Sequence, residues 1–220
     1  MPDSGGFDSP PSVPDWLRPL VEQVRTVRAE QLSRFVPPAD GSGRHSAVLM
    51  LFASPAGVEQ ADVLLLRRAA TLRSHAGQTA FPGGATDPGD LSPSDTALRE
   101  AEEEVGLNRA GVEVLAELPA LYLPPSGFVV TPVLGYWRTP HPVGVLDTAE
   151  VAGVQRLPIS GLVDPVNRFT VRHPSGFFGP GFEVDGLFVW GFTAGLLDRL
   201  LRLAGWERPW DRTVTRLVTD

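Results

Sequence analysis

Residues 92–106 constrain the fold most strongly, because their pattern predicts a capped helix with one apolar face. Ser92 can cap the first turn, Pro93 suits the first helical position, and Asp95 complements the positive end of the helix dipole. Gly106 is a natural stop, since glycine readily adopts the left-handed conformation that ends a helix. With about 100° of rotation per residue, one face of the helix is apolar and consists of Ala97, Leu98, Ala101 and Val105. We expect this face to lie against the core of the domain.

The neighbouring face of this helix is acidic. Glu100, Glu103 and Glu104 are related as i, i+3 and i+4, and therefore form one stripe. Like charges at this spacing cost about 0.2–0.5 kcal/mol per pair. The stripe is either a solvated helix face or a site where a divalent cation offsets the repulsion. Carboxylate ligands in a chain without cysteine or clustered histidine favour Mg²⁺ or Mn²⁺ over zinc or copper.

The rest of the chain alternates strand-like and helix-like segments. Apolar, β-branched runs predict strands at residues 46–53, 61–66, 112–123, 128–137 and 150–157, and a hairpin at 182–191 that turns at Asp185-Gly186. Helical spacing predicts helices at 15–35, capped by Asp15, and at 193–203, while 37–43 and most of 67–82 read as loops. This order predicts one α/β domain in which helices cover both faces of a mixed β-sheet. We expect residues 1–14 to be disordered, 15–205 to form the domain and 206–220 to form a C-terminal tail.

Composition excludes several classes of function. The chain has no cysteine, and all 19 of its lysine-plus-arginine residues are arginine. Thiolate nucleophiles, Schiff-base chemistry and the lysine of a P-loop are therefore excluded. The net charge of −7 argues against broad nucleic-acid binding, and no apolar run reaches the roughly 18 residues that span a membrane. The N-terminus lacks the features of a signal peptide, so we expect a cytoplasmic protein.

The segment Phe81-Pro82-Gly83-Gly84 precedes the acidic helix, and together they resemble the Nudix box, G-x5-E-x7-R-E-U-x-E-E-x-G-U, in which U is apolar. Residues 99–107 match every specified position of its second half. The first half departs, because Asp90 stands for the glutamate, and eight residues rather than seven separate it from Arg99. That glutamate is not usually a direct metal ligand in the family, so we expect the departure to affect shape more than chemistry. The resemblance implies a Nudix-type α/β/α sandwich and a metal-dependent phosphoanhydride hydrolase.

The segment upstream of the box resembles the coenzyme A pyrophosphatase branch of this family. The signature of that branch is L-L-T-x-R-[SA]-x3-R-x3-G-x3-F-P-G-G, and residues 64–84 match it except that Leu66 replaces the threonine. Residues 72–78, 125–128 and 189–194 are also similar to this branch. The resemblance implies that the substrate is coenzyme A or acyl-CoA. The products would be adenosine 3′,5′-bisphosphate and 4′-phosphopantetheine or its acylated form.

The resemblance also implies a set of substrate-binding residues: Arg68, Arg73, His75, Gln78, Gly83 and Gly84. The two arginines would bind phosphate through their guanidinium forks, and surface pairing with acids is the alternative for both. His75 either contacts the substrate or packs and caps the loop, and Gln78 either touches the ligand or satisfies loop backbone. The paired glycines let the backbone approach a ligand closely, and a carbonyl there can join a metal shell.

In the implied mechanism, water attacks one phosphorus of the anhydride. Glu100 and Glu104 would hold Mg²⁺ or Mn²⁺, with Glu103 as a third ligand or as the base. Arg99 would hold the glutamates in place from outside the metal shell. Some family members take the base from a later loop, and Glu150 stands where such a residue is expected. A solvated carboxylate at a strand end is the alternative interpretation of Glu150.

Two other functions compete with this one. A Nudix pyrophosphatase for ADP-ribose, dinucleotides or nucleoside triphosphates would use the same box, because the substrate pockets of this family are built from variable loops. A non-catalytic nucleotide-binding module is disfavoured, since a retired site has no need of the acidic stripe. The apolar helices at both ends either pack within the domain or form a homodimer contact. The sequence predicts a small-molecule substrate and neither a nucleic-acid nor a membrane partner.

Overall fold

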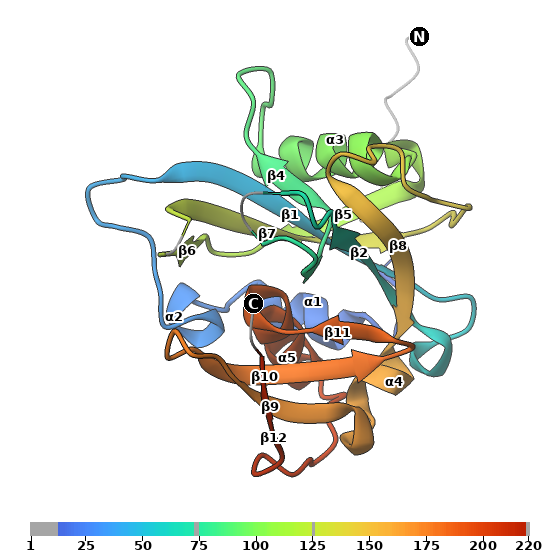
Figure 1. The fold of residues 1–220 in the computed structure, drawn as a ribbon. Coiled ribbons are helices and arrows are strands. Elements are labelled where there is room, and N and C mark those ends of the chain that lie inside the picture. Colours follow the sequence, from blue (N-terminus) through green and yellow to red (C-terminus); the bar gives the residue numbers. More distant parts are fainter. Residues whose placement is uncertain (1–12, 73–74, 125, 219–220) are drawn as a thin grey trace, which may run out of the picture.

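The computed structural model describes residues 13–72, 75–124 and 126–218. The chain forms two β-sheets, with helices packed between and outside them (Figure 1). In chain order the elements are α1 (Arg18–Val24), α2 (Ala29–Leu32), β1 (Arg44–Ala53), η1 (Val58–Gln60), β2 (Asp62–Arg68), β3 (Thr79–Ala80), β4 (Gly83–Ala85), α3 (Pro93–Val105), η2 (Arg109–Gly111), β5 (Val112–Glu117), β6 (Leu121–Leu123), β7 (Phe128–Trp137), β8 (Val151–Pro158), α4 (Ile159–Val163), η3 (Pro165–Asn167), β9 (Arg168–Arg172), β10 (Phe178–Val184), β11 (Leu187–Val189), α5 (Gly191–Leu203) and β12 (Thr215–Leu217).

The first sheet is mixed and has a split near its centre. Its main order is β3-β2-β1-β7-β5, with β4 paired to β1, β6 to β7 and β8 to β2. β1 and β7 run parallel, and the other pairs are antiparallel. Near the C-terminal end of β1, Phe52 pairs with Val63 of β2. Near the start of β1, Ser46 pairs with Ala85 of β4. β1 and β2 therefore diverge, and the chain from β3 to β4 lies between their separated ends.

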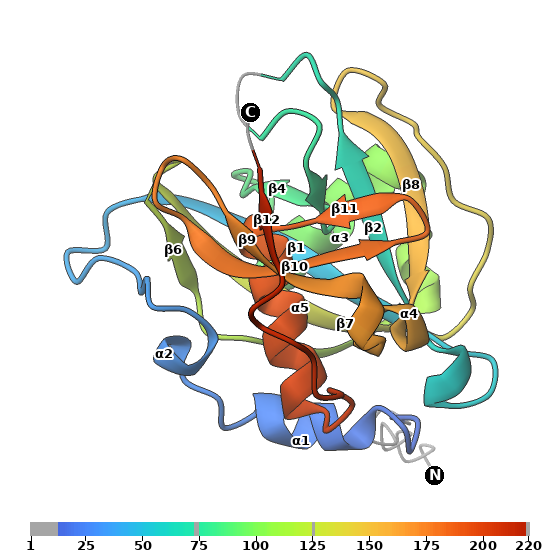
Figure 2. The same cartoon turned by 60° about the horizontal axis from the view of Figure 1, so that its bottom comes forward.

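Helices cover both faces of this sheet, as Figures 1 and 2 show. On one face, Ala97, Ala101 and Val105 of α3 belong to a buried core shared with β1 and β2. On the other face, Leu197 and Leu200 of α5 share a core with α1 and with strands of both sheets. The predicted α/β fold, with a mixed sheet between helices, is confirmed.

The second sheet has the order β11-β10-β9-β12 and packs on α5. Its β10–β11 hairpin turns at Asp185 and Gly186, which have positive φ angles of 50° and 76°, so that prediction is confirmed. β9 and β12 were not predicted; they pair in parallel, so part of the expected C-terminal tail joins a sheet. Thr79 Oγ1 donates to the carbonyl of Phe188 (2.8 Å), which ties β3 of the first sheet to β11 of the second.

The predicted helix at residues 15–35 is wrong in extent, because the chain forms two short helices there. The cap of α1 is Leu17 rather than Asp15, and Asp15 instead pairs with Arg18 at 2.6 Å. Between the helices, Arg28 is extended, with φ −101° and ψ 157°. The preceding Val27 is β-branched and buried, so packing outweighs its weak preference for a helix.

The predicted strand at 112–123 is also interrupted. β5 ends at Glu117 and β6 begins at Leu121, with Pro119 between them. Proline lacks the N–H that a strand would donate to its neighbour, which explains the break. The expected loop at 67–82 is shorter than predicted, because β2 continues to Arg68 and β3 pairs with it.

Both terminal helices pack within the domain. Leu20 of α1 and Leu197 of α5 lie in the same core, and the ring of Trp206, just beyond α5, lies 5.7 Å from that of Trp16. Residues 1–12 of the segment expected to be disordered lie outside the described residues. Within the described part of the chain, no helix is both long and apolar enough to cross a membrane.

Candidate active site

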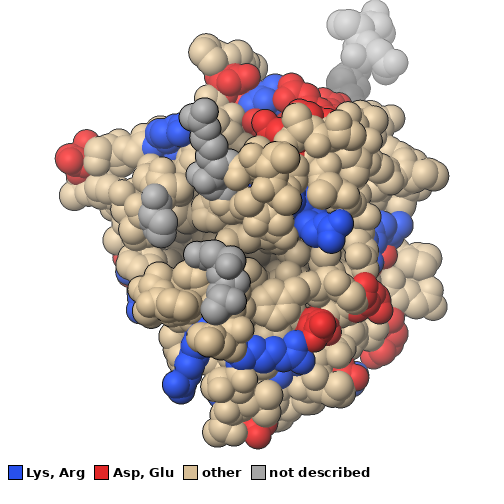
Figure 3. Space-filling model, viewed as in Figure 1, with Lys and Arg blue, Asp and Glu red and all other residues tan. Residues whose placement is uncertain are grey.

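α3 begins and ends where its sequence predicts. Ser92 Oγ accepts a hydrogen bond from the Asp95 N–H (3.1 Å), and Gly106 has a left-handed conformation with φ 73°. Burial of the apolar face against the first sheet fixes the rotation of the helix about its axis. The acidic stripe consequently turns toward the start of β4. Figure 3 shows acidic side chains gathered around α3, at the top of that view.

Gly83 and Gly84 meet the acidic stripe at close range. A Cβ on Gly84 would lie 2.5 Å from the carboxyl carbon of Glu100. A Cβ on Gly83 would lie 2.3 Å from the Ala47 carbonyl oxygen, and Gly83 also has a φ of 153° that side chains disfavour. The two glycines therefore allow a backbone approach that other residues would block.

Glu104 is the most unusual ionisable group of the site. The residue is 3% exposed, its Oε2 accepts from the Gly83 N–H (2.9 Å), and no described residue hydrogen-bonds its buried Oε1. Burial raises the pKa of Glu104 to about 8, although the hydrogen bond from Gly83 and the charge of Arg68 lower it. A buried oxygen without a partner is costly, and a cation beside it would remove that cost.

The carboxylates of the site act on one another. Burial raises the pKa of Glu100, Arg99 opposes that shift, and the negative charges of Glu103 and Glu150 add to it. Glu100 and Glu150 also raise the pKa of Glu104. Glu150 precedes β8, and its carbonyl accepts a hydrogen bond from the backbone just beyond β2 (2.7 Å). The structure therefore brings Glu150 within electrostatic range of the stripe.

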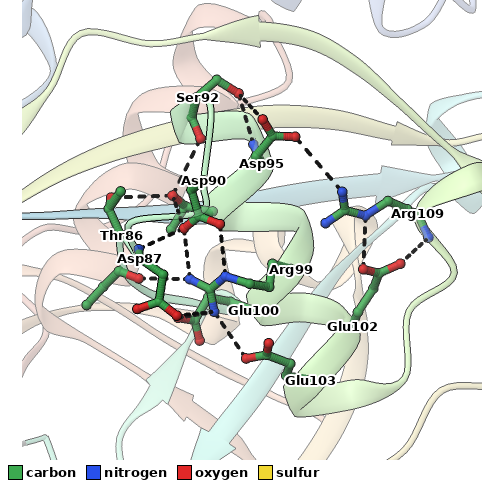
Figure 4. A network of polar contacts seen from close by, with 12 residues as sticks. Thr86, Asp87, Asp90, Ser92, Asp95, Arg99, Glu100, Glu102, Glu103 and Arg109 are labelled. Carbon is green, nitrogen blue, oxygen red and sulfur yellow. Dashed lines mark hydrogen bonds and ion pairs between the residues drawn. The ribbon is translucent and has the colours of Figure 1, made fainter.

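Arg99 ties the stripe to the loop before α3, as Figure 4 shows. Its guanidinium donates to both oxygens of Asp90 (3.0 Å each) and to the carbonyl of Ala85 (2.9 Å). It also donates to Glu100 and Glu103, at 3.1 Å each. Arg99 thus binds Glu100 and Glu103 and makes no hydrogen bond to the buried Oε1 of Glu104.

Asp90 is the residue that departs from the Nudix box. Its side chain is 6% exposed, and the hydrogen bonds from Arg99 lower its pKa well below the usual range. Thr96 Oγ1 (2.9 Å) and the Asp87 N–H (2.9 Å) donate to the same carboxylate. Asp90 therefore forms an ion pair with Arg99 despite its shorter side chain and the additional residue between them.

The three predicted metal ligands do not all converge. The Glu103 side chain is 60% exposed and pairs with Arg99. Throughout the described ranges, no group of three or more His, Cys, Asp or Glu side chains is placed to hold a metal. Glu100 and Glu104 do meet at Gly83-Gly84, and their hard oxygens include the unpartnered Oε1. This donor set fits Mg²⁺ or Mn²⁺, since such ions complete their shells with water and phosphate oxygens.

The predicted substrate-binding residues are placed unevenly. Arg68 lies toward the stripe: its charge lowers the pKa of Glu104, and its buried Nε has no partner among the residues described. Arg73 lies outside the described residues. His75 Nδ1 and Gln78 Oε1 contact each other (3.0 Å), and the Gln78 carbonyl accepts from the Arg68 N–H (2.9 Å). Both residues thus have partners within the loop, and their contact with a substrate stays a prediction.

Two hollows lie along β8, away from the stripe. One of about 580 Å³ is lined by residues 140–143 and 154–156. The other, of about 180 Å³, lies between β2–β8 and the β10–β11 hairpin. Neither hollow includes Glu100 or Glu104, so the donor groups rather than surface concavity mark the candidate site.

The family model for the NUDIX domain matches residues 43–173, which is more than half of the chain and includes the stripe, its glycines and Glu150. The chain belongs to the Nudix hydrolase family. Nudix hydrolases generally use a divalent metal such as Mg²⁺ or Mn²⁺ and act on small nucleotide substrates.

Relatives of this Nudix hydrolase carry the same family name. NudL of Photorhabdus laumondii subsp. laumondii, described as an uncharacterized Nudix hydrolase, is 38% identical over 170 residues, which cover 72% of this chain and 84% of the relative. NudL of Yersinia enterocolitica is 37% identical over 194 residues, covering 82% and 95%. The crystal structure of the Nudix hydrolase RenU from M. smegmatis is 23% identical, with a TM-score of 0.49, and the match covers 81% of this chain and 98% of RenU. At that identity and score the solved structure adds nothing to the family assignment, which rests on the sequence matches.

Proposed function

We propose that this Nudix hydrolase cleaves the diphosphate of coenzyme A or acyl-CoA. The products are adenosine 3′,5′-bisphosphate and 4′-phosphopantetheine or its acylated form. The observation that carries the hydrolytic part is the buried, unpartnered Oε1 of Glu104 beside Glu100 and the paired glycines. The choice of coenzyme A is supported by the upstream signature at residues 64–84.

In this proposal, Glu100 and Glu104 hold Mg²⁺ or Mn²⁺. A bound divalent ion lowers the pKa of coordinated water and neutralises charge on diphosphate oxygens. The Gly83 N–H holds Oε2 of Glu104, and Oε1, which has no partner among the described residues, would be the oxygen that binds the ion. Arg99 restrains Glu100, so that a metal-free site keeps its geometry.

Glu150 is the proposed base, in preference to Glu103. Glu103 already forms an ion pair with Arg99, so its carboxylate is engaged by the guanidinium rather than left for the attacking water. The charge of Glu150 acts on both Glu100 and Glu104, and its backbone is fixed beside the end of β2. A water between these carboxylates could pass its proton to Glu150 as it attacks phosphorus.

Arg68 is the proposed phosphate ligand, and it lies on the same side of the sheet as Glu104. Its guanidinium is near enough to lower the pKa of Glu104, and a phosphate oxygen would satisfy its buried Nε. Arg73, His75 and Gln78 are proposed to complete this site from the loop after β2. The glycines Gly83-Gly84 would let the diphosphate reach the metal.

The test compares Glu104→Gln with Glu102→Gln on the same helix. Glu102 points away from the stripe and pairs with Arg109 (2.9 Å), so its replacement controls for loss of a helical glutamate. With metal, purified protein and a panel of coenzyme A, ADP-ribose, NADH and nucleotides, we expect coenzyme A to be the preferred substrate. Glu104→Gln should lower kcat at least about a hundredfold, and Glu102→Gln should leave it unchanged. Near-normal turnover by folded Glu104→Gln would contradict the metal assignment, and preference for ADP-ribose would contradict the substrate.

The same assay separates the two candidate bases. Glu150→Gln should reduce kcat by about 10²-fold or more. Glu103→Gln should lower kcat less, because Arg99 keeps its hydrogen bonds to Asp90 and Glu100. The reverse order would assign the base to Glu103.

A further inference from the structure

Arg67, next to the proposed phosphate ligand, faces the other side of the sheet. Side chains of a strand alternate between its two faces. Arg67 therefore shares a face with Leu65, which belongs to the core built with α5. Arg68 shares a face with Leu64, which belongs to the core beneath α3. Arg67 occupies the unspecified position of the upstream signature, so the sequence pattern did not single it out.

The space beside Arg67 is left open by a glycine. Arg67 lines the hollow of about 180 Å³ between the two sheets. Its direct cross-strand partner on β8 is Gly153, and such partners project to the same face. A Cβ on Gly153 would meet no atom within 4 Å, and its φ is not in the left-handed region. Neither crowding nor backbone conformation requires glycine here, and its missing side chain keeps the hollow open.

The opposite wall of the hollow is held in place. Gly186 and Leu187 of the β10–β11 hairpin line it. Gln155, two residues beyond Gly153 on the same face of β8, donates from Nε2 to the Asp185 carbonyl (3.2 Å). This hydrogen bond tethers the hairpin to β8, so the hollow has a wall from each sheet.

The charge of the hollow is positive. The residues that line it are Arg67, Gly153, Val154, Gln155, Gly186 and Leu187, and the arginine is the charged member. Among the described residues, no carboxylate forms an ion pair with Arg67. A guanidinium presents two parallel N–H donors that match phosphate oxygens. The volume is below the roughly 300 Å³ at which drug-sized pockets begin, so it suits a single phosphate group rather than a nucleoside.

We propose that Arg67 and the hollow beside Gly153 bind a phosphate monoester of the substrate, apart from the place where the diphosphate is cleaved. This inference rests on the proposed function, under which the group is the ribose 3′-phosphate of coenzyme A. Arg67 and Arg68 are consecutive at the end of β2 and project to opposite faces.

The first test compares coenzyme A with dephospho-coenzyme A, which lacks only the 3′-phosphate. Arg67→Gln should raise the KM for coenzyme A about tenfold and that for dephospho-coenzyme A less than about twofold, with kcat unchanged. Arg67→Lys keeps the charge without the fork and should give an intermediate KM. Arg25→Gln, at an exposed arginine that ends α1, is the control and should change neither KM. An equal rise for both substrates in Arg67→Gln would overturn the proposal.

A second variant fills the hollow without touching the arginine. Gly153→Val suits a β-strand and has room at its Cβ, so the protein should fold. It should reproduce the selective rise in KM for coenzyme A. A folded Gly153→Val protein with an unchanged KM for coenzyme A would show that the hollow holds no phosphate.

Binding measurements separate this proposal from the proposed activity. Calorimetric titration compares adenosine 3′,5′-bisphosphate with adenosine 5′-monophosphate on the parent and on Arg67→Gln. The parent should prefer the bisphosphate about tenfold, and Arg67→Gln should lose that preference. If the parent hydrolyses neither coenzyme A nor its dephospho form, the proposed substrate fails, and this titration still decides the Arg67 site. Equal binding of the two nucleotides by the parent would overturn it.

Discussion

Glutamine at position 104 should stabilise the metal-free protein at high pH, because it removes a buried charge. Burial raises the pKa of Glu104 from 4.5 to about 8 in the folded protein. Between these two pH values the folded state keeps a proton that the unfolded chain has released. By linkage, this proton contributes fully to the free energy of unfolding below about pH 4.5. That contribution is lost as pH rises through the window.

The width of the window sets the size of the effect. A pKa raised from 4.5 to about 8, at about 1.36 kcal/mol per unit, corresponds to a loss of about 5 kcal/mol above the window. Relaxation around the charged form makes this an upper bound. Burial also raises the pKa of Glu100, so its contribution has the same sign. Glu104→Gln should therefore have the same free energy of unfolding as the parent at about pH 4 and exceed it by up to about 5 kcal/mol at about pH 9.

Urea unfolding in the presence of a chelator measures this difference at each pH. Glu102→Gln is the control, because its side chain is 38% exposed and pairs with Arg109, and it should show no pH-dependent gain. Added Mn²⁺ should stabilise the parent and not Glu104→Gln, since only a protein that binds the ion gains from it. A difference between Glu104→Gln and the parent that stays constant from about pH 5 to pH 9 would refute the reasoning.

The remaining predictions concern the residues that hold the acidic stripe in position. Asp90→Ala should lower the free energy of unfolding by about 2–3 kcal/mol in urea titrations, because it removes both hydrogen bonds from Arg99. Asp87→Ala, at a side chain 66% exposed and 3.9 Å from Arg99, should change it by less than about 0.5 kcal/mol, and equal losses in the two variants would contradict this account. Gly84→Ala should lower kcat about tenfold or more, because its Cβ would displace the Glu100 carboxylate. Gly89→Ala, whose Cβ would meet nothing within 4 Å, should keep normal turnover, and an active Gly84→Ala enzyme would argue against a fixed Glu100.

Local signals predicted α3 well, because every determinant of that helix lies within it. The cap at Ser92, the left-handed stop at Gly106 and the apolar face are short-range features. The burial of Glu104 was not predicted. This burial depends on Gly83 of β4, which is distant from α3 in the sequence and donates a hydrogen bond to the Glu104 carboxylate. Helical periodicity grouped the three glutamates but could not distinguish the buried one from the exposed Glu103.

Long-range pairing accounts for the rest of what was missed. β9 and β12 form a parallel pair between segments more than 40 residues apart, and neither segment carries a strong pattern of its own. The pairing of Arg67 with Gly153 on β8 is likewise a long-range feature, which the local sequence pattern does not contain. The family resemblance implied that Glu150 supplies the base from a later loop, and this role stays a prediction.

The central claim is that Glu100 and Glu104 hold a hard divalent ion against the Gly83-Gly84 backbone. Anomalous diffraction from crystals containing Mn²⁺ and a slowly hydrolysed diphosphate measures this directly. The account predicts an anomalous peak about 2.0–2.3 Å from oxygens of both carboxylates and of the diphosphate. A structure that places Mn²⁺ elsewhere, with Glu104 Oε1 still buried and uncoordinated, would contradict it.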